Sequence, residues 1–244
     1  MAADTPVLLL VHGFPLDSRM WFAQVEGLSG LRRVMAPDLD GHGGARDRQP
    51  SDSIDGLARQ LARHMDDAGV DAVDLAGLSM GGYICFAFLR LFPERVRSLV
   101  LVDTKATADT EAGRAGRDAL AARIREEGAA AAAEVMLPKM LTPGAGEKVR
   151  EWVHHMMLEQ PPEALVADLV AMRDRPDSTP DLAQVRVPTL VVVGDADEVT
   201  LPAEAEAMAS AIPDARLVAI PGAAHLSPVE RADDVNAAIQ DHLR

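Results

Sequence analysis

The sequence has a single cysteine, Cys85, among its 244 residues, and aromatic side chains make up only 3% of it. One cysteine excludes an internal disulfide and a metal site built from cysteines. The chain also lacks an apolar run of about 18 residues that could span a bilayer, and it lacks the basic start and apolar core of a secretory signal. We therefore expect a cytoplasmic protein in which Cys85, between Ile84 and Phe86, is a buried packing residue.

Basic residues are also few. The 24 Lys and Arg residues stand against 38 Asp and Glu residues, which gives a net charge of −14. Such a negative field repels phosphate backbones and anionic membrane surfaces, so we expect neither nucleic acid nor a membrane as a partner. Hydrophobic residues at 48% and charged residues at 25% are ordinary for globular proteins. The sequence predicts a globular protein and leaves its oligomeric state open, a homodimer included.

Six short apolar runs predict β-strands, at residues 7–11, 33–36, 73–77, 98–102, 189–194 and 216–220. Continuous apolar strands that alternate with helical patterns are typical of an α/β fold, in which helices cover both faces of a mostly parallel sheet. Residues 103–187 show no strand pattern, and four helical segments are predicted there, at 111–128, 129–136, 146–158 and 162–173. We therefore expect an α/β core, 1–104 and 186–244, with a helical cap inserted at 105–185.

The cap carries a soft apolar set, Met136, Met140, Trp152 and Met156. Unbranched, polarizable methionine side chains adapt to irregular surfaces. We expect these four residues to form the roof of a substrate pocket. Ordinary packing between cap helices explains the same pattern equally well.

A serine lies in a glycine-rich turn, Gly77-Leu78-Ser79-Met80-Gly81-Gly82, directly after the third predicted strand and before a helical pattern. A tight strand-to-helix turn lifts a serine hydroxyl clear of the sheet, and the glycines permit the close backbone approach that it needs. The motif alone would be a common glycine-rich turn. Its place between a strand and a helix predicts that Ser79 is a nucleophile.

A serine nucleophile needs a base within hydrogen-bond reach, and the base needs an acidic group that orients it. His225 lies in a turn after the last predicted strand, at the sheet edge where ligands bind in open α/β folds. Asp195, Asp197 and Glu198 follow the fifth predicted strand, in the chain order Ser, acid, His that is expected of a nucleophile turn in an α/β fold. Asp103, at the end of the fourth predicted strand, is the reserve acid. Clustered carboxylates also suit a hard cation, but nothing nearby completes a coordination loop, so no metal is expected.

The remaining histidines are weaker candidates for the base. His12 and His42 follow earlier strands in glycine-flanked loops, and we expect them to be hydrogen-bonded residues that shape the site. The others fall in helical patterns: His64, His154, His155 and His242.

The loop His12-Gly13-Phe14-Pro15 follows the first predicted strand. An amide of this loop can join the amide after the nucleophile in stabilising the oxyanion of a tetrahedral intermediate. We expect the backbone N–H groups of Phe14 and Met80 to be these donors.

Several stretches together resemble the esterase, enol-lactonase and cofactor-free perhydrolase branch of the α/β-hydrolase superfamily. They are 12–17, 36–43, the glycine-rich turn around Ser79, 92–96, 194–197 and 222–230. The resemblance implies the α/β-hydrolase fold, with the cap inserted after the family's sixth strand. It also implies Asp197, the last residue of a Gly-x-x-Asp turn, as the acid and His225 as the base. Relatives usually begin with a β-hairpin before the first strand found here, which only residues 1–6 precede, so we expect a sheet shortened at that edge.

The sequence thus predicts a serine hydrolase that cleaves a small carboxylic ester or lactone through an acyl-enzyme, without a cofactor. One alternative is an enol-lactonase of aromatic degradation, whose anionic substrate would need a cation such as Lys105, Arg173 or Arg175. A second is a perhydrolase that uses hydrogen peroxide as acyl acceptor. A third, from another class, is a ligand-binding protein with a vestigially active triad.

Overall fold

The computed structural model describes residues 6–244, and its centre is a sheet of six parallel strands. The strands are β1 (Val7–Val11), β2 (Arg33–Met35), β3 (Val73–Leu78), β4 (Val96–Val102), β5 (Thr189–Gly194) and β6 (Arg216–Ile220). Their order across the sheet is β2-β1-β3-β4-β5-β6. All six predicted strands are confirmed, with β2 slightly shorter than expected and β3 and β4 slightly longer.

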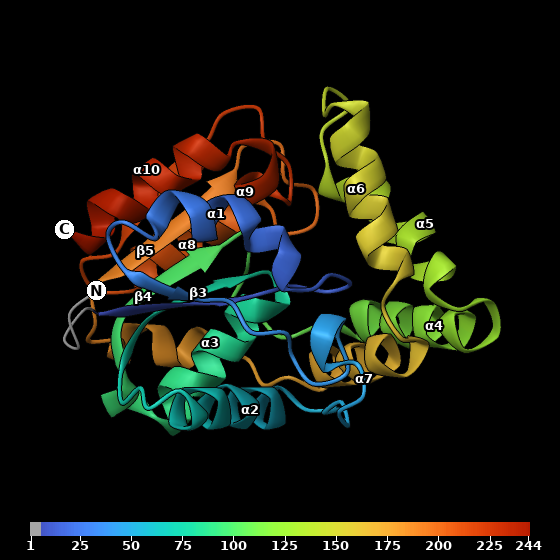
Figure 1. Ribbon diagram of the computed structural model, residues 1–244, viewed down its shortest axis with the longest axis horizontal. Helices are drawn as coiled ribbons and strands as arrows, with labels where there is room; N and C mark the ends of the chain where they lie inside the picture. Colours follow the sequence, from blue (N-terminus) through green and yellow to red (C-terminus); the bar gives the residue numbers. More distant parts are fainter. Residues whose placement is uncertain (1–5) are drawn as a thin grey trace.

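Helices cover both faces of the sheet (Figure 1). One face carries α2 (Ile54–Asp67), α3 (Met80–Leu91) and α8 (Pro202–Ala211), and the other carries α1 (Phe22–Leu28) and α10 (Ala232–Leu243). Successive side chains of a strand point to opposite faces. In β1, Leu9 therefore packs into the first apolar cluster, whereas Leu8 and Leu10 pack into the second. Burial on both faces explains why the four central strands read as continuous apolar runs, whereas the edge strands β2 and β6 are partly exposed.

Four helices lie between β4 and β5 in the chain and sit together beside the sheet in Figure 1. They are α4 (Glu111–Glu127), α5 (Ala129–Met140), α6 (Glu147–Leu158) and α7 (Pro162–Arg173). The described chain has no strand here, as the sequence predicts. The boundaries 105 and 185 given for a cap stay a prediction, and we use the word cap for α4 to α7.

Local sequence explains where two cap helices begin. The hydroxyl of Thr110 accepts a hydrogen bond of 3.1 Å from the amide of Gly113, which caps the first turn of α4. Gly128, with φ of +76°, lies between α4 and α5 and lets the chain turn there. The end of α5 differs from the prediction, because the helix continues past residue 136 with Pro138 inside its last turn. Burial of Met140 stabilises this turn although proline donates no hydrogen bond.

Hydrogen bonds tie the cap to the core at several places. The amide nitrogen of Gln160 donates to Oδ2 of Asp17 over 2.7 Å. The hydroxyl of Thr142 donates over 2.6 Å to Oε1 of Glu230, which lies near the end of the chain. The backbone amide of Leu226 donates to the carbonyl of Met140 over 3.0 Å. The last two contacts fix the cap against the turn that carries His225.

In the described residues, β2 forms the sheet edge at which the sequence predicts a shortened sheet. Residues 1–5, on which that expectation also depends, lie outside the described residues. No helix within residues 6–244 combines the length and the apolar character needed to cross a membrane.

Candidate active site

Ser79 occupies a strained turn between β3 and α3, with φ of 53° and ψ of −112°. A positive φ is uncommon for a residue with a side chain and is often found at functional sites. The turn is also crowded. A Cβ atom on Gly77 would lie 2.3 Å from the carbonyl oxygen of Gly81, and one on Gly81 would lie 2.3 Å from that of Val11. Only glycine fits these two positions, so the structure has the strand, turn and helix that a nucleophile elbow requires.

His225 and Asp197 lie in contact in the turns that follow β6 and β5. Nδ1 of His225 is 2.8 Å from Oδ2 of Asp197, and both side chains are fully buried. Thr200 supports the carboxylate, because its hydroxyl donates to Oδ2 over 2.7 Å and its amide donates to Oδ1 over 3.1 Å. Burial would raise the pKa of Asp197, but the hydrogen bonds from His225 and Thr200 outweigh it and hold the pKa below its ordinary value. Asp197 is therefore an ionised carboxylate in direct contact with the imidazole.

Ser79 and His225 lie at the same edge of the sheet. The hydroxyl of Thr104 donates to the carbonyl of Ser79 over 2.7 Å, and the amide of Ser227 donates to Asp103 over 3.1 Å, so both segments are fastened to the end of β4. Nε2 of His225 is buried and has no hydrogen-bond partner among residues 6–244. A hydrogen bond between this atom and the Ser79 hydroxyl is not formed. Such contacts are often loose before substrate binds.

The loop after β1 lies against Ser79. A Cβ atom on Gly13 would be 3.3 Å from Cβ of Ser79 and 2.8 Å from Cδ2 of Leu78. Within the described part of the chain, the amides of Phe14 and Met80 donate no hydrogen bond to a carbonyl or side chain. Met80 is the first residue of α3, where backbone N–H groups have no partner inside the helix. Both amides predicted as oxyanion donors are thus free at the elbow.

The other carboxylates considered for the acid accept hydrogen bonds elsewhere. Asp195 accepts from the amide of Gly222 over 2.8 Å. Asp103 accepts from Gly194 and Ser227 and makes no hydrogen bond with His225. As for metals, the described residues contain no group of three or more His, Cys, Asp or Glu side chains arranged as ligands.

His12 and His42 are buried side by side behind the loop after β1, with ring centroids 5.2 Å apart. Nε2 of His12 accepts a hydrogen bond of 3.1 Å from the amide of Leu39, and burial lowers the pKa of His12 to about 4. Nε2 of His42 lies 3.0 Å from Oδ2 of Asp168 in α7. Burial alone would lower the pKa of His42, but the charge of Asp168 raises it above its usual value. These histidines therefore support the loop and join it to the cap.

Two of these contacts escape the sequence reasoning. Thr200 stands three residues after Asp197, and this spacing could have predicted its hydrogen bond to the carboxylate. Asp168 lies on a helix far along the chain, and nothing local indicates that it meets His42.

The four apolar cap residues differ in placement. Met140 and Met156 are buried in one apolar cluster together with Leu226, which neighbours His225. Met136 is half-buried and packs against both clusters, whereas Trp152 is 37% exposed. Their role in a substrate pocket stays a prediction, and Met140 is the one tied directly to the turn of the base.

The cations considered for an anionic substrate are already paired with carboxylates. Lys105 lies 3.4 Å from Glu204, and Arg173 contacts Asp118 and Asp174. The buried guanidinium of Arg175 lies 2.8 Å from Asp109 and stacks over the ring of Tyr83.

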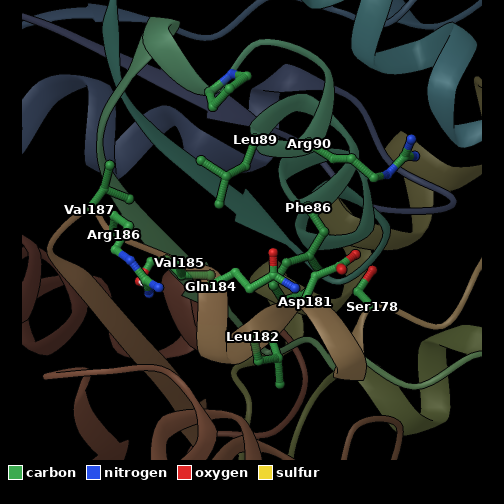
Figure 2. A pocket seen from close by; sticks show the side chains of 11 residues that line it. Phe86, Leu89, Arg90, Ser178, Asp181, Leu182, Gln184, Val185, Arg186 and Val187 are labelled. Carbon is green, nitrogen blue, oxygen red and sulfur yellow. Dashed lines mark hydrogen bonds between the residues drawn. The ribbon is translucent and has the colours of Figure 1, made fainter.

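A surface pocket of about 350 Å³ lies away from Ser79. Figure 2 shows Phe86 and Leu89, from the second half of α3, facing Leu182 and Val185 across it. A helix rises 1.5 Å per residue, which puts Leu89 about 15 Å along α3 from the elbow. No residue of the predicted triad lines this pocket.

Comparison with known proteins gives a consistent result. A family model described as the alpha/beta hydrolase fold matches residues 6–232. Among solved structures, a thermophilic esterase from Thermogutta terrifontis is 40% identical, with a TM-score of 0.95 over 98% of this chain and 89% of that chain. The enol-lactonase from Burkholderia xenovorans LB400 is 28% identical, with a TM-score of 0.91 over 99% of this chain and 92% of that chain.

Among curated relatives, the pimeloyl-[acyl-carrier protein] methyl ester esterase of Aromatoleum aromaticum is 30% identical over 99% of both chains. Against two others, both acetyltransferase components of an acetoin cleaving system, the chain spans 63% of the relative's length.

Proposed function

The chain belongs to the α/β-hydrolase family, and we propose that it hydrolyses small carboxylic esters or lactones through an acyl-enzyme formed on Ser79. The observation that carries this proposal is the buried contact of His225 with Asp197, which leaves Nε2 of the imidazole free at the sheet edge where Ser79 stands. Similarity to an esterase and to a methyl ester esterase supports the choice of esters.

In the proposed reaction, the Ser79 hydroxyl attacks the ester carbonyl and transfers its proton to Nε2 of His225. Asp197 stays ionised, holds the proton on Nδ1 and stabilises the imidazolium. The imidazolium then protonates the leaving alcohol, which leaves an acyl group on Ser79. Water, deprotonated by His225, hydrolyses this ester in the second half of the reaction.

Negative charge develops on the carbonyl oxygen during both halves. We assign its stabilisation to the amides of Phe14 and Met80, because both are free and both belong to segments in contact with Ser79. Fixed backbone donors need no reorganisation as the charge forms, and removing one such donor typically costs about 100-fold or more in rate.

The carboxylate partners of the three candidate cations favour a neutral substrate. Lys105, Arg173 and Arg175 all have carboxylate partners, so none offers a free positive charge to an anionic substrate. Met140 and Met156 belong to a buried apolar cluster on the cap side of the His225 turn. A small, fairly apolar acyl group fits such surroundings best.

The test is hydrolysis of p-nitrophenyl esters, from acetyl to longer acyl chains, by the native protein and by Ser79→Ala. We expect steady turnover of the shorter esters by the native protein and a loss of several orders of magnitude in the variant, as follows from removal of a triad nucleophile. Ser29→Ala is the matched control, because Ser29 is exposed and its hydroxyl contacts only the carbonyl of Glu26. Unchanged activity in Ser79→Ala would overturn the mechanism, and an inactive native protein would overturn the substrate class.

A second candidate substrate is an enol-lactone, because an enol-lactonase shares the fold over almost the whole chain. The same serine would open the lactone, and the released enol would remain part of the product, where it becomes a ketone. Comparing kcat/KM for 3-oxoadipate enol-lactone with that for neutral esters distinguishes the two. A preference for the anionic lactone would favour the enol-lactonase and would contradict the assignment of a neutral substrate.

A further inference from the structure

Asp103 is a buried carboxylate for which the proposed reaction has no use. It follows β4, which lies between the strand that leads to Ser79 and the strand that leads to Asp197. Its φ of 43° is unusual for a residue other than glycine, and none of its surface is exposed. An unpaired buried charge is costly, so a strained, buried aspartate must be held by specific partners.

The partners of Asp103 come from two different turns. Oδ1 accepts a hydrogen bond of 2.8 Å from the amide of Gly194, three residues before Asp197. Oδ2 accepts from the amide of Ser227 over 3.1 Å and from its hydroxyl over 2.6 Å, two residues after His225. One carboxylate therefore holds the turn of the acid and the turn of the base at the same time.

The backbone around Asp103 extends this connection to the nucleophile. The amide of Ser79 donates to the carbonyl of Val102 over 3.0 Å, and the amide of Asp103 donates to the carbonyl of Val192 over 2.9 Å. A Cβ atom on Gly194 would lie 2.3 Å from the carbonyl oxygen of Ala224, so the two turns are also in direct contact. Small displacements at Asp103 would thus be transmitted to Ser79, Asp197 and His225 together.

We propose that Asp103 is a positioning residue, which sets the relative placement of Asp197, His225 and Ser79 by binding the two turns to the end of β4. The proposal rests on the hydrolase mechanism above. Asp103 touches neither the substrate nor the reacting atoms in this scheme and acts only through the segments that it holds.

The ionisable groups that face Asp103 are His225 and Asp197. Burial raises the pKa of Asp103 to about 7; His225 opposes this rise, and Asp197 adds to it. Above that pH the carboxylate accepts all three hydrogen bonds, whereas below it one oxygen carries a proton. The positioning contact is therefore complete only in the ionised form, which gives the proposal a pH signature.

The experiment compares Asp103→Asn with the native protein on a p-nitrophenyl ester. The carboxamide keeps the shape but loses the charge and one acceptor. We expect kcat to fall by about 100-fold at pH 8, as a misplacement of about 1 Å can cause, while KM changes little. The ratio of native to variant kcat should shrink as the pH is lowered through about 7.

Asp74→Asn is the matched control. Asp74 is also buried and accepts hydrogen bonds from Ser98 and Arg32, each over 2.8 Å, but it lies at the start of β3, away from the triad. This variant should lose stability yet keep the native kcat and pH profile. If Asp103→Asn behaves in the same way, Asp103 has a structural role only and the proposal is wrong.

If Asp103→Asn fails to fold, Ser227→Ala tests the same positioning contact in a milder way. It removes only the 2.6 Å contact and should lower kcat in the same direction by a smaller factor. An unchanged kcat in Ser227→Ala would contradict the proposal. Ser79→Ala separates the two levels of inference: an active Ser79→Ala variant refutes the hydrolase mechanism, whereas an inactive one together with a fully active Asp103→Asn variant refutes the role of Asp103 alone.

Discussion

Nδ1 of His225 lies 2.8 Å from Oδ2 of Asp197, in a contact from which solvent is excluded on both sides. The two residues follow different strands and are brought together because β5 and β6 are adjacent and parallel. In the proposed mechanism the ionised carboxylate accepts a hydrogen bond from Nδ1, so that Nε2 faces the nucleophile. The first two of the following predictions test the orientation of this ring.

Asp197→Asn should lower kcat by about 10,000-fold, because a carboxamide can donate to Nδ1 and so favours the wrong tautomer. The measurement is steady-state hydrolysis of p-nitrophenyl acetate at pH 8. Asp195→Asn is the control in the same turn, since Asp195 accepts only from the amide of Gly222. A native rate in Asp197→Asn would assign the acid elsewhere.

Thr200→Val should lower kcat by about tenfold, because the hydroxyl bonds a buried carboxylate and such bonds are worth about 1.5 to 3 kcal/mol. Valine keeps the volume and removes the donor. Thr200→Ser restores the hydroxyl and should recover most of the lost rate. Equal rates for the valine and serine variants would show that the hydroxyl does not support Asp197.

Gly81→Ala and Gly116→Ala, both within helices, should change the free energy of unfolding in opposite directions. The new Cβ at Gly81 would lie 2.3 Å from a carbonyl of β1, whereas nothing lies within 4 Å of one at Gly116. We expect Gly81→Ala to destabilise the protein by about 3 kcal/mol and Gly116→Ala to stabilise it by up to about 1 kcal/mol. Denaturant unfolding measures both. A stable Gly81→Ala variant would contradict the close approach of α3 to β1.

The pH dependence of stability should reflect His12. Its pKa falls from 6.5 to about 4 on folding, so below pH 6.5 the unfolded chain binds a proton that the folded chain does not bind. Stability from this group is therefore present above pH 6.5 and is lost as the pH falls toward about 4. The free energy of unfolding of His12→Gln should fall less steeply over this range.

His154→Gln serves as the control for this measurement, because His154 is exposed on α6. Groups remote from His12 titrate in all three proteins and cancel in the comparison, whereas His42, whose charge affects the pKa of His12, contributes to the difference. If the native protein and His12→Gln show the same slope between pH 4 and pH 6.5, His12 is not buried in its neutral form.

Much of the fold follows from local sequence. Apolar runs predict all six strands, and the signal is strongest in the four central ones, β1, β3, β4 and β5, because these are buried on both faces. The turn of Ser79 is predictable because only glycine fits the crowded positions around it. The end of α5 is not predictable from local sequence. Pro138 favours an earlier end of the helix, but burial of Met140 outweighs this preference.

For the proposed site at Ser79, Asp197 and His225 as well, some features follow from local sequence and others do not. The sequence alone determined that Ser79, Asp197 and His225 lie in turns after strands. Strands and turns depend on a few neighbouring residues, so local sequence is enough to predict them. Only the tertiary structure decided that Asp197 contacts His225, that Asp103 holds both of their turns, and that Asp168 meets His42. These contacts join residues far apart in the chain, and they form because the order of strands and the packing of the cap bring their segments together.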